Sequence, residues 1–173
     1  MGIIKNYVQL LDKGYVKTIE IFIEIAQFDP VKFVHYLKDD FRESTDINLH
    51  KKLAKKYCSG GILYETKIRY LLEILLPSLK ERKDFMDFYT GTFLVFIFDK
   101  CTKSVPILEM IFLFCEKIPE SYSLNSLIVN NKVFEKVNSL IGTTMNKKEY
   151  MMAVKIIRTY LTPVANLNEL QEK

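Results

Sequence analysis

Residues 107–119, ILEMIFLFCEKIP, decide the fold, because this apolar segment of helical spacing ends at a proline and the pattern recurs along the chain. Three more segments of this kind occur: KTIEIFIEIAQFDP at 17–30, IRYLLEILLP at 68–77 and AVKIIRTYLTP at 153–163. The closing prolines follow one another at intervals of 47, 42 and 44 residues. Such a period, with two or three helices per unit, is the signature of HEAT and armadillo repeats. The sequence therefore predicts an all-α chain, built as an armadillo/HEAT-like α-solenoid of about four helical repeats.

Equivalent positions in the four segments carry apolar side chains. Counting back nine residues from each proline gives Ile21, Ile68, Met110 and Val154. Counting back seven gives Ile23, Tyr70, Phe112 and Ile156. We expect Phe112 and Ile156 to face the core between repeats, because each helical pair buries its apolar faces against its neighbours. An irregular bundle of helices is the alternative to this stacked arrangement.

The apolar residues recur with helical spacing over nearly the whole chain, as Ile19, Phe22, Ile23 and Ala26 show. The pattern predicts helices near 2–11, 15–28, 30–42, 47–57, 62–76, 81–101, 105–118, 122–130, 132–141 and 147–162. One of the predicted starts has Asp as N-cap before Pro30, and another has a capping box between Asn146 and Glu149. We expect one domain over residues 1–163 and a short C-terminal tail over 164–173.

Residues 89–98, YTGTFLVFIF, are rich in β-branched and aromatic side chains, which favour a strand. No other segment has a strand pattern that could pair with it. An all-round apolar helix is a buried helix, and we interpret the segment in this way.

The composition limits the classes of protein to which the chain can belong. Its 173 residues are 49% hydrophobic and 27% charged, as in one ordinary soluble domain. Its 25 basic and 21 acidic residues leave a net charge of only +4, which argues against a dedicated nucleic-acid binder. The longest uncharged apolar run, 88–98, is too short to cross a bilayer. The three cysteines, Cys58, Cys101 and Cys115, lie in apolar helical segments, so we expect reduced core thiols in the nucleus or the cytoplasm.

Residues with catalytic or metal-binding potential are few. The two histidines, His35 and His50, have no cysteine or carboxylate at metal-ligand spacing. The pair Asp39 and Asp40 fits a solvated helix end better than an acid and a base. Glycine-rich phosphate loops and serine-nucleophile motifs are absent from the sequence. We therefore expect a protein that is not an enzyme and has no metal and no cofactor.

A basic stripe on the predicted helix 47–57 is the candidate partner-binding surface. It consists of Lys51, Lys52, Lys55 and Lys56, whose spacing places them along one side of a helix. A second basic cluster lies on the last helix, at Lys147, Lys148, Lys155 and Arg158. Either set could bind an acidic partner segment, and either could be an ordinary solvated face. Aromatic residues interleaved for stacking on bases are missing beside these lysines, so no direct nucleic-acid contact is expected.

Two long parts of the chain support a family resemblance. Residues 106–142, PILEMIFLFCEKIPESYSLNSLIVNNKVFEKVNSLIG, followed by KEYMMAVKIIRTYL at 148–161, are similar to the armadillo-like core of regulatory subunit 3 of protein phosphatase 4. Residues 20–37, EIFIEIAQFDPVKFVHYL, and 83–101, KDFMDFYTGTFLVFIFDKC, resemble earlier helices of the same family. The chain resembles a reduced member of that family or a fragment of one.

The resemblance implies a non-catalytic scaffold that positions a serine/threonine phosphatase on its substrates. The implied partners are the phosphatase catalytic subunit and possibly a second regulatory subunit. A different armadillo or HEAT adaptor, such as a scaffold that activates a kinase, is the second interpretation. A small all-α enzyme or lipid carrier with an apolar pocket around residues 93–98 is the third.

Overall fold

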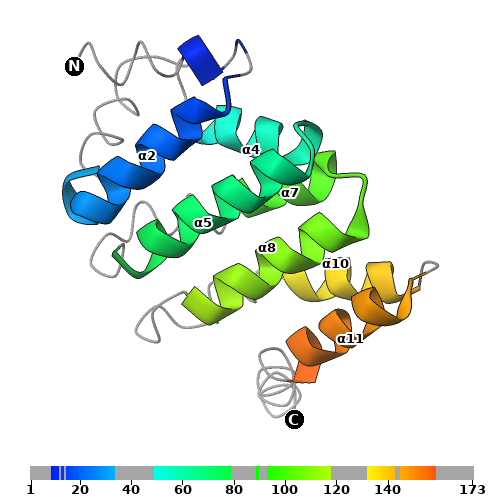
Figure 1. The fold of residues 1–173 in the computed structure, drawn as a ribbon. Helices are drawn as coiled ribbons and strands as arrows, with labels where there is room; N and C mark the ends of the chain where they lie inside the picture. The colour runs from blue at the N-terminus through cyan, green and yellow to red at the C-terminus, as the bar shows by residue number, and fades with distance from the viewer. Residues whose placement is uncertain are drawn as a thin grey trace. The chain divides into compact units, whose positions relative to one another are not determined.

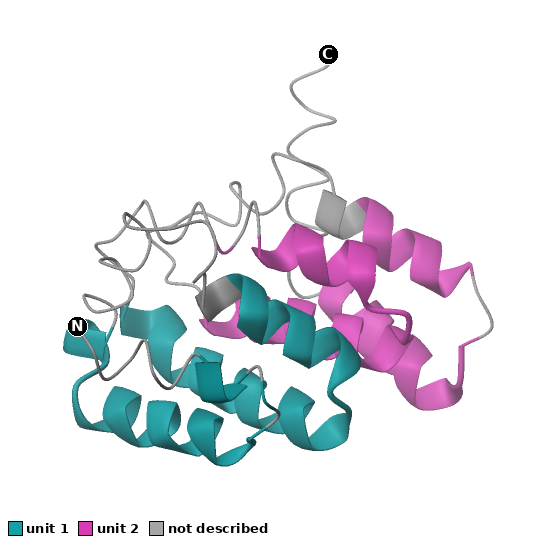
Figure 2. Cartoon of the chain, turned by 90° about the horizontal axis from the view of Figure 1, so that it is seen from above, with its two compact units in different colours: residues 1–85 teal, residues 86–173 magenta. Residues whose placement is uncertain are grey.

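A computed structural model describes the chain over residues 9–11, 13, 15–33, 49–78, 89, 93–117, 132–142 and 145–158. Every regular element within these ranges is a helix, which confirms the predicted all-α class. The chain divides into two compact units, residues 1–85 and residues 86–173, coloured separately in Figure 2. Each unit has buried apolar side chains of its own.

The first unit contains the helices α2 (Lys17–Phe28), α4 (Leu49–Ser59) and α5 (Ile62–Ser78), shown in Figure 1. Helix α5 packs against both α2 and α4 and is therefore central to the unit. The contacting faces are apolar at helical spacing, as the sequence predicts. Their buried residues are Ile19, Phe22, Ile23 and Ala26 of α2, Leu53, Ala54 and Tyr57 of α4, and Ile68, Leu71, Leu72 and Leu75 of α5.

The corner after α2 is fixed by a side-chain cap and by aromatic packing. Asp29 Oδ1 accepts a hydrogen bond from the backbone N–H of Lys32 at 2.9 Å, which confirms the predicted N-cap. Pro30 fits directly after the cap because the first position of a helix needs no N–H donor. The ring of Phe33 lies 5.9 Å from that of Phe22, centroid to centroid, and is buried with it.

Two polar contacts join α2 to α5 beside their apolar seam. Lys67 Nζ lies 2.5 Å from Glu20 Oε1 in an ion pair. The Gln27 amide donates a hydrogen bond of 2.8 Å to the hydroxyl of Tyr70. These contacts fix the register of the two helices, because each joins one specific residue pair.

The second unit contains α7 (Leu94–Lys100), α8 (Ser104–Lys117), α10 (Lys132–Ile141) and α11 (Lys147–Ile156). Helix α8 contacts the other three and is buried along most of its length. The ring of Phe114 on α8 stacks on that of Phe93 at 6.3 Å, and Tyr89 lies edge-on to Phe93 at 5.4 Å. These three aromatic side chains contact one another and are buried in the core of the unit.

The aromatic segment at 89–98 is helical where the structure describes it. Helix α7 starts at Leu94, and Leu94, Ile97 and Phe98 are buried. Lys136 of α10 donates a hydrogen bond of 2.9 Å to the carbonyl of Phe98 near the end of α7. Strand propensity is therefore overridden by burial of an apolar helix, which confirms our interpretation over residues 93–98.

Most helix ends lie within two residues of their predicted positions, and α10 matches exactly in its span of 132–141. The prediction that each helix ends at its proline is wrong for α5, which continues through Pro77 to Ser78. Proline lacks the N–H donor and crowds the preceding turn, and α5 ends one residue after Pro77. The predicted helix 122–130, most of 2–11 and 30–42, and the tail 164–173 lie outside the described residues.

The four positions that lie seven residues before a proline are not all buried. Ile23 and Ile156 are buried, as expected. Tyr70 is 45% exposed, because its hydroxyl lies at the rim where Gln27 can reach it. Phe112 is only partly buried, and Lys155 Nζ lies 4.8 Å from the centre of its ring. Phe112 is therefore less buried than the fully buried Ile156 at the equivalent position.

Candidate functional site

The basic stripe lies on α4, beside the buried side of that helix. Leu53, Ala54 and Tyr57 are buried, and the intervening positions are lysines. An α-helix repeats every 3.6 residues, so this sequence separates an apolar side from a basic side within three turns. All four predicted lysines, Lys51, Lys52, Lys55 and Lys56, are on the basic side.

The structure divides the stripe into two pairs. Lys51 and Lys55 are exposed, whereas Lys52 and Lys56 are partly buried. Lys56 Nζ lies 5.5 Å from the centre of the Tyr64 ring on α5, a cation–π contact of about 0.5–1 kcal/mol at such sites. Lys56 therefore helps to hold α4 on α5, and the two exposed lysines are the better candidates for contact with a partner.

The turn between α4 and α5 is made by two glycines. A Cβ atom on Gly60 would lie 2.6 Å from the carbonyl oxygen of Lys56 and 2.7 Å from the Tyr64 ring, so no side chain fits there. Gly61 has φ +85°, in the left-handed region that favours glycine. This tight turn brings the start of α5 close to the end of α4.

Two exposed aliphatic residues follow this turn. Ile62 is 78% exposed and Leu63 is 54% exposed. Neither belongs to the buried residues of α5, the first of which is Tyr64. The start of α5 thus presents two exposed apolar side chains directly after the helix that carries Lys51 and Lys55.

Ile62 and Leu63 are not among the binding residues expected from the sequence. A signal for them exists in the register of α5, whose buried residues Tyr64, Ile68, Leu71 and Leu75 follow a helical spacing. The residues one turn after Ile62 and Leu63 are Glu65, Thr66 and Lys67, which are polar, so no apolar stripe continues from these two residues along α5.

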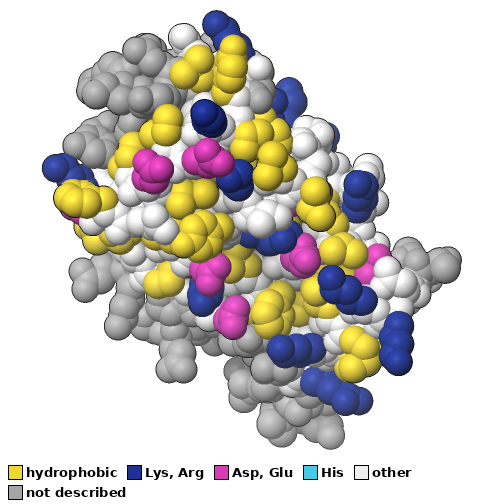
Figure 3. All heavy atoms as spheres, viewed as in Figure 1, with side chains coloured by type: hydrophobic (Ala, Val, Ile, Leu, Met, Phe, Trp, Pro, Cys, Tyr) yellow, Lys and Arg dark blue, Asp and Glu magenta, His cyan; other side chains and the backbone are white. Residues whose placement is uncertain are grey.

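The second basic cluster lies in the other unit, on α11 and the turn that continues it. Lys147, Lys148, Lys155 and Arg158 are all exposed. Figure 3 shows lysine and arginine side chains gathered over this part of the molecule. The structure thus places each predicted cluster on a single helix.

Groups that could support catalysis or metal binding are sparse where the structure describes the chain. No three histidine, cysteine or acidic side chains of the described residues come together in a way that could hold a metal ion. His35, Asp39 and Asp40 lie outside the described residues. His50 belongs to α4, but its side chain is also outside them.

The three cysteines are free thiols. Cys101 and Cys115 are buried as predicted, whereas Cys58 is only partly buried. Burial raises the pKa of the Cys115 thiol to about 12. A thiol in this state has little thiolate and is a poor nucleophile near neutral pH.

None of the described helices has both the length and the apolar character needed to span a membrane. Comparison of the chain with protein-family models, curated proteins and solved structures finds no match.

Proposed function

We propose that this chain is a non-catalytic scaffold, and specifically a regulatory subunit of a serine/threonine phosphatase of the protein phosphatase 4 type. The observation that carries the scaffold proposal is the α4–α5 corner, by which we mean the exposed Lys55 and Lys51, one and two turns before the end of α4, together with the exposed Ile62 and Leu63 at the start of α5. The phosphatase follows from the family resemblance. The hydrolytic chemistry belongs to the partner, which acts in the nucleus or the cytoplasm.

An armadillo/HEAT-like solenoid of about four repeats is part of the same proposal. Its support is the packing of consecutive helices on one another: α4 on α5 in the first unit, α7 on α8 and α10 on α11 in the second. Stacked repeats scatter X-rays as a longer particle than a compact globule of equal length. We expect a radius of gyration clearly above the roughly 15–16 Å of a compact chain of this size. A compact value would favour the irregular bundle.

The partner of the α4–α5 corner should carry carboxylates that face Lys51 and Lys55 and an apolar group that covers Ile62 and Leu63. Cations at the rim of an interface raise the association rate, whereas buried apolar anchors slow dissociation. The two kinds of group therefore contribute separately measurable parts of the affinity.

The test is direct binding of the purified chain to a protein phosphatase 4 catalytic subunit, alone and with its second regulatory subunit, measured by biolayer interferometry at two salt concentrations. The double variant Lys51→Glu/Lys55→Glu should weaken binding by about tenfold or more, mainly through the association rate, and should reduce its salt dependence. Ile62→Ser/Leu63→Ser should instead speed dissociation.

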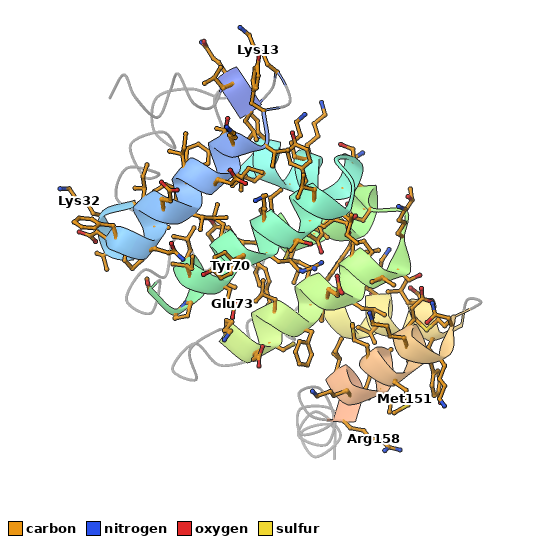
Figure 4. The ribbon with its side chains drawn as sticks, viewed as in Figure 1. Lys13, Lys32, Tyr70, Glu73, Met151 and Arg158 are labelled. Atoms are coloured by element: carbon orange, nitrogen blue, oxygen red, sulfur yellow. The ribbon has the colours of Figure 1, made fainter. Side chains whose placement is uncertain are left out.

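The matched control is Lys13→Glu/Lys32→Glu, which changes the net charge of the same unit equally. Lys13 and Lys32 are exposed and are labelled in Figure 4, and neither lies on α4 or α5. Equal loss of binding in both charge variants would mean that only the overall charge matters, which would contradict the α4–α5 corner as the binding surface. If the wild-type chain binds no phosphatase subunit and captures a kinase instead, the kinase-scaffold interpretation replaces the phosphatase proposal.

A further inference from the structure

The solvent face of α11 is basic along its whole described length. Lys147 and Lys155 lie one turn before and one turn after Met151, and Arg158 continues the row two turns beyond Met151. Met151 is 58% exposed. Figure 4 labels Met151 and Arg158, which lie on the side of the helix away from α8.

No carboxylate lies among the exposed residues of 147–158. These residues are Lys147, Lys148, Tyr150, Met151, Lys155 and Arg158. Glu149 is partly buried, and its carboxylate accepts a hydrogen bond of 3.1 Å from the backbone N–H of Asn146. The exposed residues therefore carry four positive charges, one of which, the Lys155 ammonium, lies over the Phe112 ring of α8. Salt-bridged surface helices usually mix both signs of charge, so this segregation leaves a strong local positive potential.

The structure holds this face in place. Asn146 Oδ1 accepts a hydrogen bond of 3.0 Å from the backbone N–H of Glu149, which completes a capping box at the start of α11. Ala153 and Ile156 are buried on the opposite side of the helix. A helix fixed at its start and along its inner face presents its cations in a constant arrangement, which lowers the entropy lost when a partner binds.

We infer that this face of α11 binds an acidic protein segment that carries an apolar side chain among its carboxylates. Lys147, Lys148 and Arg158 supply charges complementary to the carboxylates. Met151 supplies the apolar contact, because the flexible and polarisable thioether adapts to different side chains. This surface belongs to the second unit and does not involve the α4 lysines, so it is independent of the phosphatase-binding surface proposed above.

The mixture of groups favours a protein segment over other anionic partners. A helix that lies on a membrane needs a broad apolar face, whereas the large apolar side chains exposed on α11 are Met151, among the cations, and Tyr150. A nucleic-acid backbone would pair with the cations but would leave Met151 without an apolar partner. A peptide satisfies both kinds of group at once.

The test is fluorescence anisotropy of the whole chain with a labelled synthetic peptide rich in Glu and Asp around one central Leu. We expect Lys147→Glu/Lys148→Glu to weaken binding by about tenfold or more, since each reversal places like charges together. Glutamates are favourable in the first turn of a helix, so α11 should remain folded in this variant. Circular dichroism checks that point.

The matched control is Lys100→Glu/Lys103→Glu, two exposed lysines of the same unit with the same change in charge. Unchanged binding in this control, together with a loss in Lys147→Glu/Lys148→Glu, would support the proposed surface. Equal losses in both would overturn it.

Met151→Ser should weaken binding of the Leu peptide and leave binding of a Leu→Ser peptide unchanged. Tighter binding to phosphatidylserine vesicles or duplex DNA than to the peptide would also overturn the assignment to a protein segment.

Discussion

Two phenylalanines that lie two positions apart on α8 have different environments. Phe114 is fully buried between aromatic neighbours, whereas Phe112 lies at the edge of the core under the ammonium group of Lys155. Removing a buried side chain costs the lost burial together with a cavity, but a partly exposed side chain leaves a space that water can fill. The position of each residue therefore determines the cost of its loss.

We predict that Phe114→Ala lowers the free energy of unfolding by about 3–5 kcal/mol and that Phe112→Ala lowers it by clearly less. Chemical denaturation with matched m-values measures both effects. Lys51→Ala, an exposed change in the other unit, should stay within about 0.5 kcal/mol of the wild type. An effect of Phe112→Ala as large as that of Phe114→Ala would contradict the partial burial of Phe112.

The ion pair between Glu20 and Lys67 makes stability depend on pH. The hydrogen bond and the positive charge of Lys67 lower the pKa of the Glu20 carboxyl below its usual 4.5. A carboxyl whose pKa is lowered by folding stabilises the protein above its unfolded pKa, and this contribution is lost as the pH falls through the folded pKa.

We predict that Glu20→Gln lowers stability at neutral pH and that its difference from the wild type disappears in acid, where both side chains are uncharged. Urea denaturation across a pH series measures this convergence. Glu24→Gln removes an exposed carboxylate from the same helix and serves as the control. A Glu20→Gln deficit that is constant with pH would point to lost packing instead of lost charge.

The polar side chains at the start of α11 contribute to the stability of this helix. The Asn146 side chain and the Glu149 side chain each bond the other's backbone N–H. A helix start has unpaired N–H groups that such caps satisfy. A helix of only ten residues has few other interactions of its own, so the cap is a large share of its local stability.

We predict that Asn146→Ala lowers the free energy of unfolding by about 0.5–2 kcal/mol. Hydrogen exchange should quicken most at the first amides of α11. The control is Asn138→Ala, because Asn138 is exposed within α10 and Ala is the better helix former there. A similar loss in both variants would mean that the capping box is not the source of the stabilisation.

The helices show which features of this fold can be predicted from local patterns in the sequence. The helical class, the buried faces of α2 and α5, the Asp29 cap and the Asn146 capping box follow from local spacing, and the structure confirms them. Local spacing also placed the four lysines of the stripe on one helix. It could not tell Lys55 from Lys56, because their exposure depends on the position of Tyr64 in the next helix. For the same reason, local spacing could not predict that Tyr70 is exposed and Phe112 only partly buried, since both are at the edge of a contact between helices.

On the scale of the whole molecule, the two units give the chain two separate sets of buried side chains. The surface proposed to bind a phosphatase belongs to the first unit, and the surface proposed to bind an acidic segment belongs to the second. A scaffold with one binding surface in each unit could hold two partners at once, which raises the effective concentration of each partner for the other.

The buried Tyr89 makes the second unit sensitive to alkali. Burial raises the pKa of its hydroxyl far above the ordinary value of 10.0. A raised folded pKa contributes stability at pH values below the unfolded pKa, and the contribution is lost progressively as the pH rises above it. We predict that the wild type loses more stability than Tyr89→Phe between pH of about 9 and 11, in denaturation measured at each pH. Parallel losses in both proteins would contradict the burial of this hydroxyl.

The same residue provides an optical readout. The chain has ten tyrosines and no tryptophan, so its near-ultraviolet absorption comes largely from phenol groups. An ionised phenol absorbs at longer wavelength than a neutral one, and Tyr89 can ionise in mild alkali only when the protein around it opens. After a rapid pH jump, the slow phase of tyrosinate absorbance that Tyr89→Phe removes would therefore time the opening of the second unit, without any dye or introduced label.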